Sequence, residues 1–183
     1  MIRTDNLFSS TISGASWSTD MKYRFDLWRQ WDSRKIRMAF VMLNPSTADD
    51  VKNDPTVARC QRRALRLGAG SFHVVNLFAL RSTDPSVLYK AEDPIGSHND
   101  QYILKVAELA DLIVCSWGTR GNLKGRADQV RAILEPHRRK LRHLGLTANG
   151  EPTHPLYIPY DAELQVYQLR RGDDAVEGIQ ESG

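Results

Sequence analysis

The sequence predicts an α/β fold, a three-layer sandwich in which helices cover both faces of a central, mainly parallel sheet. Three continuously apolar segments predict the sheet, at residues 36–43, 72–78 and 112–117, because strands buried on both faces are apolar throughout. Helical patterns lie between these segments, and helical crossovers keep successive strands parallel. The length of 183 residues suits one domain. We expect residues 1–165 to form it and residues 166–183 to be a mobile tail.

The first two elements are predicted to be strands and the third a helix. Residues 21–31 alternate between apolar and polar, which is typical of a half-buried strand at a sheet edge. After the strand at 36–43, Asp54 and Pro55 form a typical helix start, with the carboxylate as the cap and the proline in the first turn. The buried face of this helix is expected to hold Val57, Cys60, Ala64 and Leu67.

Two further helices are predicted in the middle of the chain. Asp84 and Pro85 open a short one by the same logic. Ser97 and Asp100 then resemble a capping box, which indicates a helix over about residues 98–110.

The last third of the chain is expected to be mostly helical. A helix from about 125 to 135 is predicted to end at Pro136, and a short helical stretch should follow as far as Gly145. Asn149-Gly150 then indicates a tight turn between two short strands.

Composition indicates a soluble, cytoplasmic protein. Hydrophobic residues make up 41% of the chain and charged residues 26%, as in ordinary globular domains. No apolar run approaches the ~20 residues that span a bilayer, and residues 1–6 lack a signal-peptide pattern. Cys60 and Cys115 are too few for a disulfide framework, and the histidines lack zinc-site spacing. We expect a monomer with no metal, no cofactor and no membrane partner.

Basic residues gather in two places. The net charge is +3, which permits nucleic-acid binding without requiring it. A stripe at helical spacing contains Arg59, Arg62, Arg63 and Arg66, and residues 138–143 form a second cluster. Both groups have two interpretations, as solvated helix faces or as contacts to phosphate.

Polar residues follow the ends of the predicted strands, and ligands of such sheets bind beyond the carboxyl ends of the strands. The candidates chosen on this ground are Asn44, Pro45, Ser46, Thr47, Asn76, Arg81, Trp117, Gly118, Thr119, Arg120, His154 and Pro155. Two carboxamides suit the edge of a planar heterocycle, because each offers a donor and an acceptor in one plane. A histidine beside them can stabilise a departing anion.

Each candidate also has a structural interpretation. Asn44 can end a strand, Asn76 can cap a loop, His154 can be a packed loop residue, and Trp117 can belong to the core. Three carboxylates near the first strand end are expected to be solvated or capping, although one of them could activate a water. They are Asp49, Asp50 and Asp54.

The order of motifs resembles the uracil-DNA glycosylase superfamily. A strand followed by Asn44-Pro45-Ser46 matches its first motif, and Val74-Val75-Asn76-Leu77 with Arg81 resembles the strand that ends in a base-reading asparagine. Trp117-Gly118 and His154-Pro155 follow in the same order. From Met42 to Tyr157 the chain also resembles a bacterial and phage family of unknown function. The features of that family are Leu-Asn-Pro-Ser-Thr-Ala-Asp, Asn-Leu-Phe-x-x-Arg, His-Asn-Asp, Trp-Gly and His-Pro-Leu-Tyr.

The superfamily resemblance implies a DNA glycosylase that flips a damaged or modified base out of single- or double-stranded DNA. Asn44 would then hold the attacking water, His154 would stabilise the departing base, and Asn76 would read the base edge. The remaining base-binding residues implied are Pro45, Ser46, Trp117 and Gly118. The DNA-binding residues implied are Arg59, Arg63, Arg81, Arg120, Leu156 and Tyr157.

The sequence departs from the superfamily at two motifs. Asn44 replaces the aspartate that acts as general base, and Leu156-Tyr157-Ile158 replaces the Ser-Pro-Leu that follows His-Pro. The residue that enters the duplex would therefore be Leu156 or Tyr157. Two other functions stay open, a non-catalytic nucleic-acid or nucleotide binding module and a hydrolase of free modified nucleosides or nucleotides.

Overall fold

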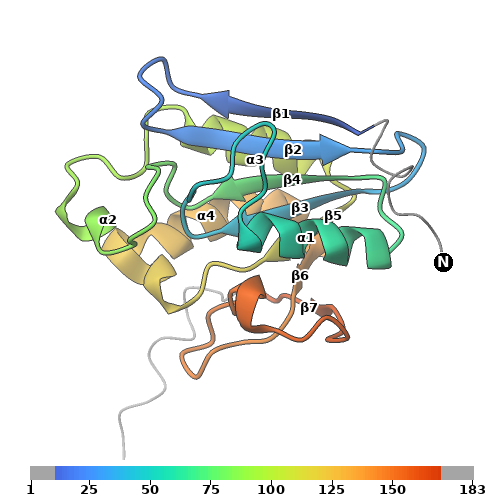
Figure 1. Cartoon of the computed structure of the whole chain (residues 1–183). Helices are drawn as coiled ribbons and strands as arrows, with labels where there is room; N and C mark the ends of the chain where they lie inside the picture. Colours follow the sequence, from blue (N-terminus) through green and yellow to red (C-terminus); the bar gives the residue numbers. More distant parts are fainter. Residues whose placement is uncertain (1–10, 170–183) are drawn as a thin grey trace, which may run out of the picture.

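A computed structural model describes residues 11–169 and shows a seven-stranded sheet with helices on both faces (Figure 1). In space the strands follow the order β1-β2-β4-β3-β5-β6-β7. Their bounds are β1 (Ile12–Trp17), β2 (Arg24–Gln30), β3 (Arg37–Met42), β4 (Ser71–Asn76), β5 (Leu112–Cys115), β6 (Leu141–His143) and β7 (Gln165–Val166). The predicted α/β class is confirmed.

The centre of the sheet is parallel and its edges are antiparallel. β3 pairs in parallel with β4 on one side and with β5 on the other, and β5 pairs in parallel with β6. β1, β2 and β7 run antiparallel to their neighbours. The three predicted central strands are therefore correct in position and direction, whereas the sheet as a whole is mixed.

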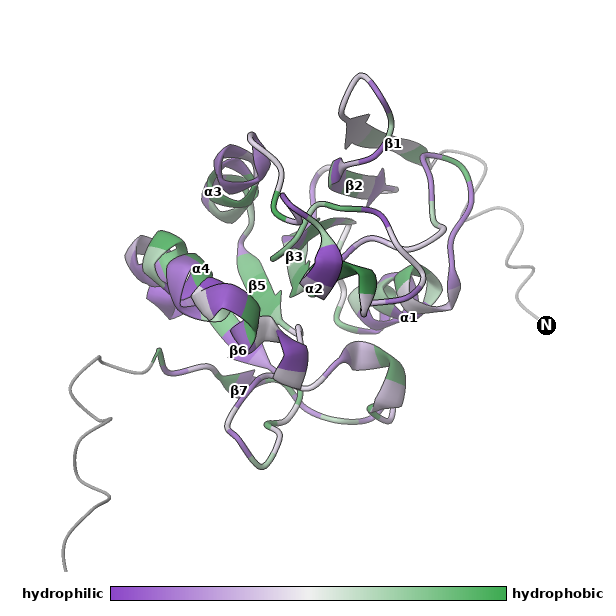
Figure 2. Ribbon diagram, turned by 90° about the vertical axis from the view of Figure 1, so that its left-hand side faces the viewer, coloured by the Kyte–Doolittle hydropathy of each residue, from purple (hydrophilic) through white to green (hydrophobic). Residues whose placement is uncertain are grey.

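Two hydrophobic cores lie on opposite faces of the sheet. Helix α1 (Pro55–Arg66) covers one face, and α3 (Asn99–Leu109) and α4 (Arg126–Leu134) cover the other (Figures 1 and 2). α2 (Val87–Lys90) is a single turn, and residues 11–169 also contain three 3₁₀ segments, η2 (Thr119–Gly125), η3 (Glu135–Lys140) and η4 (Pro155–Tyr157). Along β3 the side chains alternate between the cores, with Met38 and Phe40 facing α1 and Ala39 and Val41 facing α3 and α4.

The start of α1 forms as the sequence predicts. The Asp54 carboxylate accepts a hydrogen bond of 2.8 Å from the Val57 amide, and Pro55 occupies the first turn. Val57, Cys60 and Ala64 are buried as expected. Leu67 is the exception, because the helix has ended there and the side chain is 43% exposed.

The edge position predicted for residues 21–31 is wrong. β1, which the sequence reading missed, covers the outer side of β2. Consequently Arg24 and Asp26 are buried along with Phe25 and Leu27.

Three later details also differ from the predictions. α3 has no side-chain cap, because the helix begins one residue later than a Ser97 capping box requires, with His98 in the cap position, and Asp100 pairs with Arg126. The helix predicted to end at Pro136 is α4, which ends at Leu134, and the short helical stretch expected after it is η3, which ends at Lys140. The stretch toward Gly145 is strand β6 rather than helix.

The predicted domain boundary at residue 165 falls inside strand β7. Tyr167, beyond that boundary, is buried in the core between the sheet and α4. The domain therefore extends at least to Leu169, and residues 170–183 of the expected tail lie outside the described residues. No helix between residues 11 and 169 is long and apolar enough to cross a bilayer.

Candidate functional site

A cavity of about 580 Å³ opens at the carboxyl ends of the parallel strands, on the face covered by α1. Its polar lining residues come from five separate segments of the chain. They are Arg24, Asn44, Ser46, Asp54, Thr56, Ser82, Thr83, Trp117, Gly118, Thr119, Arg120, Thr147, Thr153, His154 and Tyr157. Eight of them were predicted from the sequence as site residues, namely Asn44, Ser46, Trp117, Gly118, Thr119, Arg120, His154 and Tyr157.

The topology explains why the cavity lies there. β4 and β5 flank β3 on opposite sides, so the chain leaves β3 first to one side and then to the other. Crevices at such switch points bind ligands in α/β sheets. β5 leaves the sheet through Gly118, whose φ of 72° and ψ of −175° are nearly restricted to glycine. The backbone conformation of this turn therefore explains why the cavity residue at position 118 is a glycine.

The fold uses the nitrogen of the Asn44 carboxamide but not its oxygen. Its nitrogen donates to the carbonyl oxygens of Pro45, at 3.0 Å, and Ser82, at 2.8 Å. Its oxygen accepts no hydrogen bond from any residue that the structure describes. Asn44 therefore ties together the loops after β3 and β4 while an acceptor remains available to a ligand or a water.

His154 is held as a neutral donor. Its Nδ1 accepts a hydrogen bond of 3.3 Å from the Leu156 amide, so in the neutral ring the proton is on Nε2. Burial lowers the pKa of His154, and the nearby Asp54 carboxylate only partly offsets this effect. The ring therefore stays neutral at physiological pH and offers Nε2–H to the cavity.

Of the three loop carboxylates proposed from the sequence, Asp54 alone lines the cavity. Its Oδ1 caps α1, whereas its Oδ2 accepts only a long bond of 3.4 Å from the Ala48 amide. Asp49 instead accepts from the amides of Val51 and Lys52, which lowers the pKa of its carboxyl group. Asp50 is exposed and lies outside the cavity lining. The structure thus reduces three candidate acids to one.

Arg24 is a cavity residue that the sequence reading missed. It comes from β2, is 1% exposed, and donates through Nη1 to the Ala48 carbonyl oxygen at 2.7 Å. Its Nε is buried without a partner. The only sequence signal was a charged residue at the start of an otherwise well-patterned strand.

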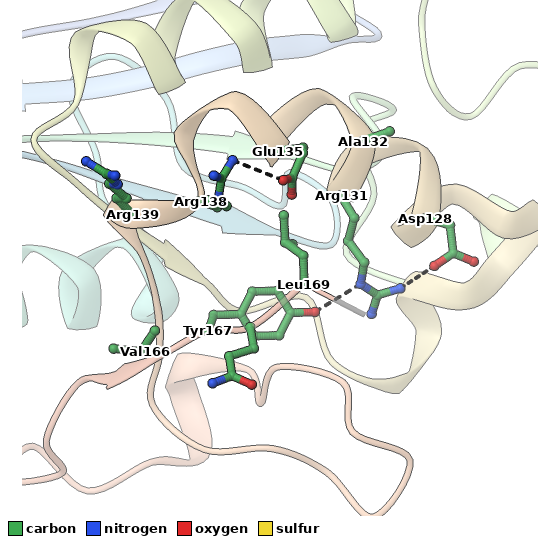
Figure 3. Close-up of a pocket in the computed structure, with 10 residues that line it drawn as sticks. Asp128, Arg131, Ala132, Glu135, Arg138, Arg139, Val166, Tyr167 and Leu169 are labelled. Atoms are coloured by element: carbon green, nitrogen blue, oxygen red, sulfur yellow. Dashed lines mark hydrogen bonds and ion pairs between the residues drawn. The ribbon is translucent and has the colours of Figure 1, made fainter. Parts of the chain in front are cut away.

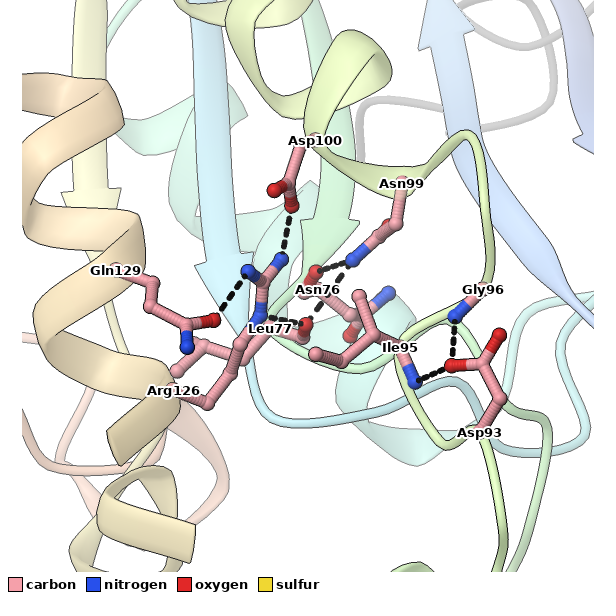
Figure 4. A network of polar contacts seen from close by, with 9 residues as sticks. All are labelled: Asn76, Leu77, Asp93, Ile95, Gly96, Asn99, Asp100, Arg126 and Gln129. Atoms are coloured by element: carbon pink, nitrogen blue, oxygen red, sulfur yellow. Dashed lines mark hydrogen bonds and ion pairs between the residues drawn. The ribbon is translucent and has the colours of Figure 1, made fainter. Parts of the chain in front are cut away.

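Asn76 lies at the end of β4 and is 0% exposed. Both polar atoms of its carboxamide lack a hydrogen-bond partner among the described residues (Figure 4). Strand alternation places this side chain with Phe72 and Val74 on the α1 face, the face of the cavity. Asn76 does not line the cavity itself. Its strand lies between β2, which supplies the cavity residue Arg24, and β3, whose Met42 pairs with Asn76 in register and also lines the cavity.

Trp117 lines the cavity but belongs mainly to the core. Its Nε1 donates to Glu151 Oε2 at 2.6 Å, and its ring meets Tyr167 edge to face. Arg131 donates to the same carboxylate oxygen at 2.6 Å and to the Tyr167 hydroxyl at 3.0 Å. This buried network fixes one wall of the cavity, and sequence reasoning missed both Glu151 and Arg131.

Arg59 and Arg63, predicted to bind DNA, hold the chain after η4 instead. Arg59 donates to the carbonyl oxygens of Pro155, at 3.0 Å, and Ile158, at 2.5 Å. Arg63 is buried and donates to those of Ile158 and Pro159, at 3.2 and 3.0 Å. The helical stripe is therefore neither a solvated face nor an open phosphate contact at these two positions, because backbone carbonyls occupy the guanidinium groups.

Of the other predicted DNA-binding residues, some line the cavity and some do not. Arg81 stabilises the loop after β3 by donating to the Ser46 and Thr47 carbonyl oxygens. Arg120 and Tyr157 are exposed and line the cavity. Leu156, like the predicted base-binding Pro45, is not among the lining residues.

A larger hollow of about 880 Å³ lies between α4, η3 and the chain after β7 (Figure 3). Most of its charged groups are paired with one another, since Arg131 contacts Asp128 and Arg138 contacts Glu135, whereas the side chain of Arg139 has no partner among the described residues. Because few polar groups remain available to a ligand there, we take the smaller cavity as the candidate site. Among residues 11–169 no cluster of histidine, cysteine or acidic side chains is placed to hold a metal ion.

Comparison with known proteins assigns the chain to one family. Residues 24–156 match the family described as protein of unknown function DUF1643. The chain belongs to this family. The matched range contains Arg24, Asn44, Asp54, Asn76 and His154, so the whole cavity except the exposed Tyr157 lies within the family match. No curated protein and no solved structure matches the chain.

Proposed function

We propose that the chain hydrolyses the N-glycosidic bond of a nucleotide, in the manner of a DNA glycosylase acting on a flipped-out damaged or modified base. The observation that carries this proposal is the buried carboxamide of Asn76, whose two polar atoms lack partners among the described residues. Buried polar groups are rarely left unpaired, because each costs about 1–3 kcal/mol. A base edge, with a donor and an acceptor in one plane, would satisfy both atoms.

The base would reach Asn76 from the cavity. Met42 lines the cavity and pairs with Asn76 in register. Its unbranched side chain can change rotamer at low cost, which would open a path from the cavity to the carboxamide. In this arrangement Asn76 selects the base, as the resemblance to the uracil-DNA glycosylase superfamily implies.

The groups around the cavity suit the two halves of the hydrolysis. A water held by Asn44 Oδ1 attacks the C1′ carbon while the C1′–N bond breaks, and Asp54 Oδ2 accepts the proton of that water. The electron pair of the broken bond stays on the base, where the Nε2–H of His154 stabilises the negative charge. These contacts strengthen as charge separates, so they act mainly on the transition state. The departing base then takes up a proton from solvent and Asp54 releases its proton to solvent, so the products are the free base and a sugar with a hydroxyl group at C1′.

The assay is base release from defined substrates. Single- and double-stranded oligonucleotides that carry different modified bases, and the corresponding free deoxynucleotides, are incubated with the protein, and free bases and abasic sites are measured. The proposal predicts release from at least one substrate. If every substrate is bound and none is cleaved, the chain is a non-catalytic binding module.

Single variants test the assigned roles. His154→Ala and Asn44→Ala should each slow base release about a hundredfold, equivalent to about 3 kcal/mol, because each removes one group that acts on the transition state. Substrate affinity should change less than threefold. His137→Ala is the matched control, because His137 lies on η3 and outside the cavity lining.

Asp54→Asn identifies the proton acceptor. Asparagine preserves the helix cap, so the variant removes the basic oxygen with little effect on α1. We expect base release to fall at least a hundredfold. If Asp54→Asn is inactive while His154→Ala and Asn44→Ala retain the parent rate, the chemistry belongs to the carboxylate and the roles given to the other two residues are wrong.

A further inference from the structure

Arg24 is a buried cation whose charge the protein leaves uncompensated. Its side chain is 1% exposed, yet it forms no ion pair with any described carboxylate. The single hydrogen bond from its guanidinium group goes to the Ala48 carbonyl oxygen, and its Nε has no partner. Burial lowers the pKa of Arg24 to about 10, so the group is still protonated at neutral pH. A buried charge without a counter-ion is strongly destabilising.

The other buried arginines have more partners than Arg24. Arg29 and Arg63 also lack an ion pair with the described residues, but each donates to three acceptors within the protein. Arg126 is equally buried, but it pairs with Asp100 and donates to the Leu77 carbonyl oxygen and Gln129. Arg131 pairs with Glu151 and Asp128. Arg24 differs from all four in that its guanidinium group donates to a single acceptor among the described residues and lines the candidate cavity.

The charges that face Arg24 do not neutralise it. Asp54 and Asp26 act favourably on it and Arg81 and Arg29 unfavourably. Asp26 is engaged by His73 at 2.9 Å, and Asp54 caps α1. The charged side chains that line the cavity are Arg24, Arg120 and Asp54. With His154 neutral, one positive charge is left over.

We infer that Arg24 binds a phosphate group of the substrate inside the cavity. A guanidinium presents several N–H donors in a fixed fork that matches phosphate oxygens. Hydroxyl groups of Ser46, Thr83 and Thr119 on the same lining can donate to the remaining oxygens. A bound phosphate would provide the counter-ion that Arg24 lacks. The inference rests on the proposed function only in naming a nucleotide as the molecule that carries this phosphate.

Two carriers offer this chemistry, a free nucleotide with a terminal phosphate and a nucleotide within DNA. The two carriers would make different contacts at the mouth of the cavity. The exposed Arg120 lies there and makes no hydrogen bond or ion pair with the described residues. A DNA strand would extend past the mouth and contact Arg120, whereas a free nucleotide would end inside the cavity.

Thermal unfolding at pH 7.5 tests the inference with inorganic phosphate, a deoxynucleoside 5′-monophosphate and the corresponding nucleoside, at constant ionic strength set with chloride. Ligand at ten times its Kd should raise the Tm by on the order of 4 °C. We expect this increase with inorganic phosphate and with the monophosphate. The nucleoside should give a smaller increase at equal concentration.

The variants separate binding from a purely structural role. Arg24→Met should abolish the increase caused by inorganic phosphate, measured against the variant's own Tm, and Arg24→Lys should weaken phosphate affinity about tenfold because lysine lacks the fork. Arg29→Lys is the matched control, because Arg29 lies on the same strand, is also buried, and donates only to protein acceptors outside the cavity. It should lower the starting Tm and leave the increase unchanged. If Arg24→Met does not fold, Arg24→Lys and Arg29→Lys decide the question.

An oligonucleotide arm identifies the carrier. If DNA is the carrier, Arg24→Lys and Arg120→Gln both weaken oligonucleotide binding; if a free nucleotide is the carrier, only Arg24→Lys weakens monophosphate binding and Arg120→Gln has no effect. An equal phosphate-dependent increase in the parent and both Arg24 variants, or no increase with any phosphate compound, overturns the inference. Absence of base release with Arg24-dependent phosphate binding intact refutes the proposed hydrolysis alone.

Discussion

The two faces of the sheet differ in how they treat polar groups at the carboxyl ends of the strands. On the face covered by α3 and α4, Trp117 and Arg131 share the Glu151 carboxylate, and Arg126 pairs with Asp100 (Figure 4). On the face covered by α1, the Asn76 carboxamide, the Arg24 Nε and the Arg63 Nε have no partners among the described residues, although the other nitrogens of Arg63 donate to backbone carbonyls. Burial is similar on both faces, so exposure to water does not explain the difference.

The difference separates structural from functional polar groups. A paired buried group stabilises the protein, and removing one partner leaves the other unsatisfied at high cost. An unpaired buried group costs stability, and it is expected where a ligand completes it. The pairing is not perfect on the α3 side, where Asn99 Oδ1 also lacks a partner, but the carboxamide nitrogen of Asn99 donates to two carbonyl oxygens.

The largest expected effect concerns the paired face. Glu151→Ala removes the shared acceptor of Trp117 and Arg131 and leaves the buried Arg131 with the exposed Asp128 carboxylate as its remaining ion-pair partner. The free energy of unfolding should fall by about 3–5 kcal/mol, measured by urea denaturation, while base release per folded molecule stays within twofold of the parent. A loss below about 1 kcal/mol would mean that this network does not stabilise the wall of the cavity.

A second comparison sets a buried arginine against an exposed one. Arg63→Met removes donors to three backbone carbonyls and should cost about 2 kcal/mol of stability, with DNA affinity unchanged. Arg120→Gln should leave stability within about 0.5 kcal/mol and, if DNA is the substrate, lower the log–log salt dependence of binding by about 1. A reduced salt dependence in Arg63→Met would restore the interpretation of the α1 arginines as phosphate contacts.

Much of the fold could be predicted, because its central elements are specified locally. The three parallel strands follow from continuous apolar runs, and α1 follows from its Asp54 cap and Pro55. β1 and β6 could not be found, because β1 is neither continuously apolar nor regularly alternating and β6 has only three residues. Asp100 was misread as a cap because its partner, Arg126, is distant in the sequence.

The candidate site shows the same limit. Asn44, Trp117, Gly118 and His154 could be predicted to meet, because each follows a strand or an expected turn in a sheet of known polarity. Arg24 could not, since nothing local distinguishes a charged residue that turns into a cavity from one that faces solvent. Arg59 was misassigned for the related reason that helical spacing does not show what packs against the helix.

A smaller effect is expected in the dependence of stability on pH. Burial lowers the pKa of His154 in the folded protein, whereas the unfolded chain titrates near about 6.5. Below that pH the unfolded state binds more protons, so His154 makes stability fall as the pH decreases toward its lowered pKa. His154→Gln should flatten this part of the curve. Burial also lowers the pKa of His143, but that contribution is present in both proteins. Parallel curves for the two proteins would show that His154 is not held neutral.

The most direct test of the account compares two asparagines that are both 0% exposed, Asn76 and Asn99. Asn99→Ala removes two hydrogen bonds to backbone carbonyls and should lower the free energy of unfolding in urea by about 2–3 kcal/mol. Asn76→Ala removes a carboxamide without partners and should change that free energy by less than about 1 kcal/mol, while base choice in the release assay is relaxed or lost. If Asn76→Ala destabilises the protein as much as Asn99→Ala and leaves base choice intact, the unpaired carboxamide is part of the fold and the account is wrong.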